Sequence, residues 1–169
     1  RSFLKTIKAT WFRINVATPL VGSEMFNTAI EKNYLKGDYM SSNYKTSVIE
    51  TEDFTAKEIG EFAYSLNLEL NFVENSDLRL GNYEDALKGF MKTLKLKQDH
   101  AFASYFAAIC YKKMNLKDQY QTYKTKYQKI LDKSVLWLDY AKRFNLPYEP
   151  SEFRLGINIL DNEQVVAQA

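Results

Sequence analysis

Cysteine, histidine, proline and glycine are all scarce in this chain of 169 residues, which has one Cys, one His, three Pro and six Gly. A single cysteine excludes an internal disulfide framework and fits a reducing compartment, so we predict a cytoplasmic protein. The scarcity of proline and glycine favours long helices over a β-sandwich with many turns. The single histidine, His100, has no second histidine to complete a common metal site, so we predict no metal site in this chain.

The net charge of the chain is also small, and its apolar runs are short. The chain has 23 basic and 21 acidic residues and a net charge of +2, which favours neither nucleic acid nor an anionic membrane as a partner. Its longest apolar runs are only a few residues, far shorter than a membrane-spanning helix requires. No secretory signal opens the sequence. From the start at Arg1 rather than Met we expect either a processed chain or a piece of a longer protein, and we prefer the second.

Hydrophobic residues make up 46% of the chain, and their spacing predicts helices through residues 54–145. Thr55 and Glu58 have the spacing of a capping box, and one long helix is predicted from there to Gly81. Four more apolar stripes follow with short connections, which is typical of stacked antiparallel hairpins. The stripes begin with Tyr83, Phe102, Tyr120 and Val135.

Residues 1–53 predict a mixed α/β segment. Alternation of side chains over residues 11–17 predicts a β-strand with Phe12, Ile14 and Val16 on one face. A turn follows at Pro19 and Gly22, and then a helix capped by Ser23. We also predict a short extended segment at residues 47–51. Residues 146–169 are predicted to be a tail.

The run Gly81-Asn82-Tyr83-Glu84-Asp85-Ala86-Leu87-Lys88-Gly89-Phe90 resembles the tetratricopeptide repeat, a helix–turn–helix of 34 residues. Glycine permits the tight turn, a small residue fits the close helix crossing, and an aromatic residue fills the next gap. The resemblance covers about two hairpins over residues 67–133, and it weakens outside the run. We therefore predict a mainly α fold of tetratricopeptide-like hairpins with a short α/β remnant at its N-terminus. The alternative is a generic helical bundle.

The run from Trp11 to Glu24, WFRINVATPLVGSE, resembles the last part of a radical S-adenosylmethionine enzyme of the cobalamin-binding subgroup. In that family a late barrel strand enters an A-T-P-x-x-G-(S/T)-E turn and then a helix. The later runs EKNYL and IETEDFT are also similar to the family's continuation, although Asn33 and Val21 depart from its usual Gly and Pro. The resemblance implies three segments: a barrel remnant at 1–53, a helical region at 54–145 and a tail at 146–169.

The chemistry of that family requires parts that this sequence lacks. A [4Fe–4S] cluster in those enzymes is held by three thiolates in a C-x-x-x-C-x-x-C loop, whereas this chain has only Cys110. The resemblance therefore implies that the cluster, S-adenosylmethionine and cobalamin belong to a parent protein whose N-terminal barrel is this chain's partner. It implies one contribution from this chain, namely backbone contacts to the adenosyl group. They would come from Asn15, Val16, Ala17 and Thr18.

Other residues that could carry chemistry have simpler interpretations. Mid-helix placement predicts that Cys110 is a small buried hydrophobic residue. The carboxylates around Glu50 to Glu61 are interpreted as a solvated helix start. Lysines interleaved with tyrosines between Lys112 and Lys133 are reminiscent of a single-strand-binding surface, but the tyrosines have helical spacing and are predicted to be core.

Three functions remain open after this reasoning. The preferred one is a non-catalytic C-terminal accessory region of a radical S-adenosylmethionine enzyme, which covers the barrel or recruits a protein partner or substrate. The second is an autonomous repeat module that binds a peptide. The third is a small enzyme of unknown type. We also predict a homodimer paired through the strand at residues 11–17, because that strand would otherwise have unpaired edges.

Overall fold

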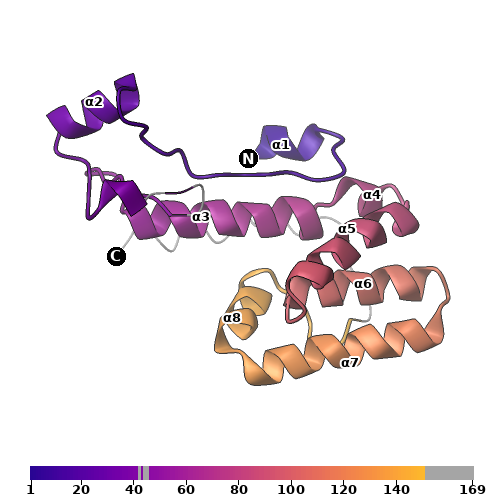
Figure 1. Ribbon diagram of the computed structural model, residues 1–169. Helices are drawn as coiled ribbons and strands as arrows, with labels where there is room; N and C mark the ends of the chain where they lie inside the picture. The colour runs from indigo at the N-terminus through magenta and orange to yellow at the C-terminus, as the bar shows by residue number, and fades with distance from the viewer. Residues whose placement is uncertain (42, 44–45, 151–169) are drawn as a thin grey trace. The chain divides into compact units, whose positions relative to one another are not determined.

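The computed structural model describes residues 1–41, 43 and 46–150, and these are mainly helical, as predicted (Figure 1). Two compact units can be distinguished. One combines Arg1–Trp11 with the chain from Glu69 onward, and the other is Phe12–Leu68. The three segments predicted from the sequence, 1–53, 54–145 and 146–169, stay a prediction. The two units are defined by contacts within the chain, and such contacts do not show from which family a segment derives.

Helices dominate the first unit, and its larger part is a set of short-linked hairpins (Figure 1). Helix α6 contacts both α5 and α7, and α8 contacts α6 and α7. The four helices that were predicted after Gly81 are therefore confirmed. The elements of this unit are α1 (Ser2–Thr6), a π turn (Glu69–Val73), α4 (Ser76–Arg79), α5 (Tyr83–Leu96), α6 (Ala101–Lys113), α7 (Lys117–Lys133) and α8 (Val135–Arg143).

Helix α6 is the centre of this unit's core. Every residue from 101 to 110 is buried, so the helix has no solvent-facing side over that length. A helix that is apolar all round must be covered on all sides. Phe102 and Phe106 of α6 join Phe72 of the π turn and Phe90 of α5 in one aromatic cluster. Burial of each such ring stabilises the fold by about 1.5–3 kcal/mol.

The long helix predicted to end at Gly81 is interrupted, and that prediction was wrong in its extent. Helix α3 (Ala56–Leu68) gives way to the π turn, and α4 starts after Asn75. The Asn75 side chain accepts a hydrogen bond from Leu78 N at 2.9 Å and donates one to Asn71 O at 3.1 Å. Asparagine ends helices because its side chain competes with the backbone for such bonds.

Glu69, at the start of the π turn, is fully buried and paired with two cations near the chain start. Its Oε2 lies 2.6 Å from Arg1 Nε, and its Oε1 lies 2.6 Å from Lys5 Nζ. Arg79 adds a hydrogen bond from Nη2 to Lys5 O at 2.9 Å. A buried carboxylate is costly without opposite charge, so these pairs fix α1 beside the π turn.

The second unit contains α2 (Glu24–Glu31), a 3-10 turn (Tyr39–Ser41) and α3. The predicted caps are present. Ser23 Oγ accepts a hydrogen bond from Phe26 N at 3.2 Å, and Thr55 and Glu58 exchange reciprocal bonds of 2.7 and 3.2 Å. The hydrogen bonds from Thr55 lower the pKa of the Glu58 carboxyl.

The strand predicted at residues 11–17 does not form, and the described part of the chain contains no β-strand. The predicted alternation is nevertheless present, because Phe12 and Ile14 are half-buried and Val16 is buried. The side chain of Asn67 replaces a neighbouring strand: Oδ1 accepts from Ile14 N at 3.1 Å, and Nδ2 donates to Ile14 O at 2.7 Å. The alternation of side chains predicted correctly which of them are buried. It carried no information about whether a neighbouring strand would pair with this segment.

The predicted extended segment at 47–51 is paired with residues 34–36. Lys36 N donates to Val48 O at 2.8 Å, and Glu50 N donates to Tyr34 O at 3.0 Å. The pairing amounts to a single isolated bridge between Leu35 and Ile49. The finer expectation of an α/β remnant is not confirmed, because the described part of residues 1–53 has no strand and only two isolated bridges, Leu35 with Ile49 and Asn43 with Thr46.

Replacement of Phe90 by Ala should lower the free energy of unfolding by about 3–5 kcal/mol. The Phe90 ring is 0% exposed, and its centroid lies 5.5 Å from that of Phe72 and 6.0 Å from that of Phe106. Leu96→Ala, in the same helix but at a side chain 91% exposed, is the matched control and should change stability by less than about 0.5 kcal/mol. Urea unfolding followed by circular dichroism measures both. Equal unfolding midpoints for the two variants would contradict the assigned core.

Candidate functional site

A groove of about 1000 Å³ runs along α7 in the first unit. One wall is α7 itself, and another is the connection between α5 and α6 at Gln98 and Asp99. Its end is the junction of α7 with α8. The lining residues are Gln98, Asp99, Gln121, Thr122, Thr125, Lys126, Lys129, Ile130, Lys133 and Ser134.

The α7 side of the groove follows from helical spacing. Lys126, Lys129 and Lys133 are separated by three and four residues, so they lie on one face of the helix. Thr122 and Thr125 continue that face toward the start of α7. Ile130 is buried and gives the groove one apolar contact surface. The face therefore combines cationic, hydroxyl and aliphatic groups.

Positive charge is in excess in this groove. Three lysines line it against one carboxylate, Asp99, and the Asp99 Oδ1 atom already lies 3.3 Å from Lys97 Nζ. Lys126 lies over the ring of Tyr123 at 5.9 Å from the ring centroid. In the part of the chain that the structure describes, Lys129 and Lys133 have no acidic partner. Two groove cations are thus available to an incoming anion.

Two helix N-termini border the groove. Helix α8 is capped by Ser134, whose Oγ accepts a hydrogen bond from Trp137 N at 3.3 Å. Helix α6 is capped by His100, directly after Gln98 and Asp99. Helix N-termini carry a partial positive charge of about half an electron. They add to the lysine charge and reinforce the preference of the groove for anions.

His100 is held inside the structure rather than in the groove. Its ring centroid lies 4.9 Å from that of Phe72 and 4.7 Å from that of Trp137. Its Nδ1 accepts a hydrogen bond from Ala103 N at 3.1 Å, which caps α6. Burial, and secondarily the charge of Lys97, lowers the pKa of His100 to about 4. His100 is therefore the N-cap residue of α6.

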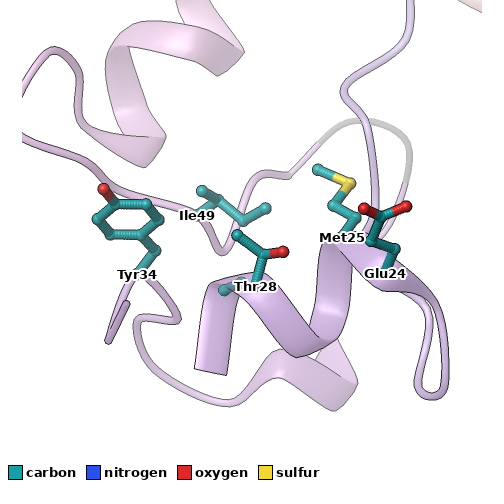
Figure 2. Close-up of a pocket in the computed structure, with 6 residues that line it drawn as sticks. Glu24, Met25, Thr28, Tyr34 and Ile49 are labelled. Carbon is teal, nitrogen blue, oxygen red and sulfur yellow. The ribbon is translucent and has the colours of Figure 1, made fainter. Parts of the chain in front are cut away.

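The second unit has a hollow of about 450 Å³ between α2 and the extended segments at Tyr34 and Ile49. Figure 2 shows Tyr34 and Ile49 at one end, Thr28 between, and Met25 and Glu24 at the other. Among the described residues that line it, Glu24 is the only carboxylate, and none is a histidine, cysteine or lysine. The titratable side chains of this described lining are the Glu24 carboxylate and the Tyr34 phenol.

The residues predicted to contact an adenosyl group lie in the extended segment of the second unit. Val16 is buried and Thr18 is half-buried, whereas Asn15 and Ala17 are exposed. None of these four residues lines the groove along α7 or the hollow beside α2. Contact of their backbone with an adenosyl group in a parent enzyme stays a prediction.

Other predicted interpretations can be compared with the structure. Cys110 is buried, as predicted, and burial raises the pKa of its thiol to about 12. Among the tyrosines predicted to be core, Tyr127 is buried, but Tyr120 and Tyr123 are half-exposed. No set of three or more His, Cys, Asp or Glu side chains is placed to hold a metal ion among residues 1–41, 43 and 46–150. No helix in that same part is long and apolar enough to cross a membrane.

Sequence reasoning noted the lysines of α7 but missed the groove. The spacing of Lys126, Lys129 and Lys133 was the available signal. The opposite wall at Gln98 and Asp99 could not be found from spacing, because it comes from another connection of the fold.

Comparison of this chain with protein-family models, with curated proteins and with solved structures finds no match.

Acidification should destabilise the protein through His100. The unfolded chain binds a proton near the ordinary histidine pKa of 6.5, whereas the folded chain binds it only near 4. Stability is therefore fully present above pH 6.5 and is lost as the pH falls toward 4, with a loss of about 2 kcal/mol by pH 5. His100→Asn keeps a cap acceptor but cannot titrate there. Urea unfolding between pH 7.5 and pH 5 should show a smaller pH dependence in this variant. An unchanged dependence would exclude His100 as its source.

Proposed function

We propose that this chain is a non-catalytic accessory region that binds a segment of a protein partner or protein substrate in the groove along α7. The observation that carries the proposal is the groove itself, about 1000 Å³ in volume, with two unneutralised lysines, a buried isoleucine and no catalytic pair. Its charge and shape suit recognition, and its lining lacks the nucleophile–base arrangement that catalysis needs.

The helical hairpins support a scaffold of the tetratricopeptide type. The run that resembles the repeat begins with Gly81 at φ +78° and continues into α5. Ala86 and Phe90 of that run are buried, as a repeat's packing positions would be. Stacked hairpins form extended concave surfaces, and repeat proteins use such surfaces to bind peptides.

We further propose that the chain belongs to a radical S-adenosylmethionine enzyme. The run from Trp11 to Glu24 supports this origin, since its extended part is followed by a turn at Gly22 (φ +86°) and the capped helix α2. In the parent protein, residues 11–17 would pair with the barrel as a strand. The cluster, S-adenosylmethionine and cobalamin would be bound by the parent's other parts. An autonomous repeat module is the second candidate, and it is favoured by the location of the groove within one compact unit.

The binding function can be tested by site-specific photocrosslinking. A photoreactive residue in place of Thr125, which lines the groove, should yield a protein crosslink in the cells that produce this protein. The same residue in place of Lys92, which is exposed on α5 and does not line the groove, is the control. We expect a discrete crosslinked product from position 125 and none from position 92. Crosslinks of equal yield from both positions, or from neither, would contradict a protein-binding groove.

The non-catalytic character of the chain can be tested by anaerobic reconstitution with iron and sulfide. One cysteine cannot replace the three thiolates that the family's cluster requires, and Cys110 is buried in α6. We expect no stoichiometric cluster and no cleavage of S-adenosylmethionine. Iron analysis and visible absorbance measure the first, and product chromatography the second. A content near four irons per chain would contradict the prediction.

A further inference from the structure

We infer that the partner segment of the α7 groove is an acidic peptide bound in extended conformation. This inference rests on the proposed protein-binding function and names the chemistry of the partner. It is carried by charge complementarity, by the direction of the groove and by the groups that line it.

Charge selects an acidic ligand. Lys126, Lys129 and Lys133 present three ammonium groups along one helix face, and the one lining carboxylate, Asp99, lies within ion-pair distance of Lys97. The other lysine of this stretch, Lys124, is paired with Glu149 and does not line the groove. Among the lysines from residue 121 to residue 133, the unbalanced charge therefore lies in the groove. An acidic segment would neutralise it without displacing an existing ion pair of α7.

The length and spacing of the groove favour an extended segment. From Gln121 to Lys133 the helix rises about 18 Å at 1.5 Å per residue. An extended peptide covers that distance with about five or six residues, and its alternate side chains are about 6.7 Å apart on one side. Lys129 and Lys133 are separated by about 6 Å along the helix axis. Carboxylates at alternate positions of the peptide can therefore each meet a different lysine.

The polar lining supplies the remaining contacts. Gln98, Gln121 and the Thr125 hydroxyl can donate and accept hydrogen bonds, as the backbone of an extended peptide requires. The Thr122 hydroxyl donates to Asp118 O at 2.9 Å and can still accept. Ile130 offers one apolar contact for a side chain that points inward.

Nucleic acid fits this groove less well. Proteins that bind single strands stack bases on aromatic side chains, and none of the lining residues is aromatic. The tyrosines of α7, which gave the single-strand interpretation, lie outside the lining.

Fluorescence anisotropy with the full chain tests the inference. The probe is a labelled hexapeptide of alternating Asp and Ser, and the comparison probes are the same peptide with Asn for Asp and a single-stranded oligonucleotide of equal charge. The variant Lys129→Glu with Lys133→Glu reverses the groove charge near the end of α7. The matched control, Lys92→Glu with Lys95→Glu, makes the same change at exposed positions near the end of α5.

We expect saturable binding of the acidic peptide that weakens at least tenfold in the groove variant and less than twofold in the control variant. Its affinity should also fall as salt rises, because the contact is ionic. Equal binding of the Asn peptide, equal losses in both variants, or tighter groove-dependent binding of the oligonucleotide would each overturn the inference. Crosslinks from position 125 without any binding of the acidic peptide would leave the protein-binding function standing and overturn only the acidic partner.

Discussion

Complete burial of α6 is the constraint on which the rest of the first unit depends. Ten consecutive residues of this helix are inside, and none of them can be turned to water without loss of apolar burial. Cover must therefore come from every side, and α5, α7, α8 and the π turn supply it. Since α7 contributes only a narrow apolar face with Tyr127, Ile130 and Leu131, its remaining surface is free to carry lysines. The core uses only this narrow face of α7, so the rest of the helix surface can form a charged groove.

The aromatic contacts at the start of α6 connect this core with the groove. His100 is held between Phe72 and Trp137, so the residues just before it have a fixed anchor. Gln98 and Asp99, which form the wall opposite α7, are those residues. Trp137 belongs to α8, whose cap Ser134 lines the end of the groove. Two boundaries of the groove are thus attached to the same buried cluster of rings, which favours a preformed groove.

The sequence predicted those features that depend on neighbouring residues. Helices α5 to α8 and the caps at Ser23 and Thr55 follow from spacing within a few positions, and they were found. The pairing of Glu69 with Arg1 and Lys5 joins residues more than sixty positions apart, and no local pattern reports such a contact. The groove was not predicted: the lysines of α7 have visible spacing, whereas the opposite wall comes from another connection of the fold. Distance along the chain, rather than residue type, separated the predictable features from the rest.

The segment at residues 11–17 also shows that local sequence does not predict contacts with distant residues. A period of two residues predicted a strand at residues 11–17, and the burial of its side chains has that period. A strand also needs a hydrogen-bonding neighbour, and here the amide of Asn67 takes that place for Ile14 alone. The sequence of a segment carries no direct information about its neighbour. The homodimer predicted through this segment stays a prediction, although its apolar face is already partly covered within the second unit.

The π turn has a consequence for how this protein tolerates substitution. All five of its residues, Glu69 to Val73, are buried, whereas an amphipathic helix always returns a side chain to the surface within that length. A survey of substitutions along the chain would therefore find a periodic pattern of tolerance in α3 and α5 and an unbroken block of intolerance between them. Evolution can vary the outer faces of those helices freely. In this block, as along residues 101–110 of α6, it can exchange residues only together with their contacts.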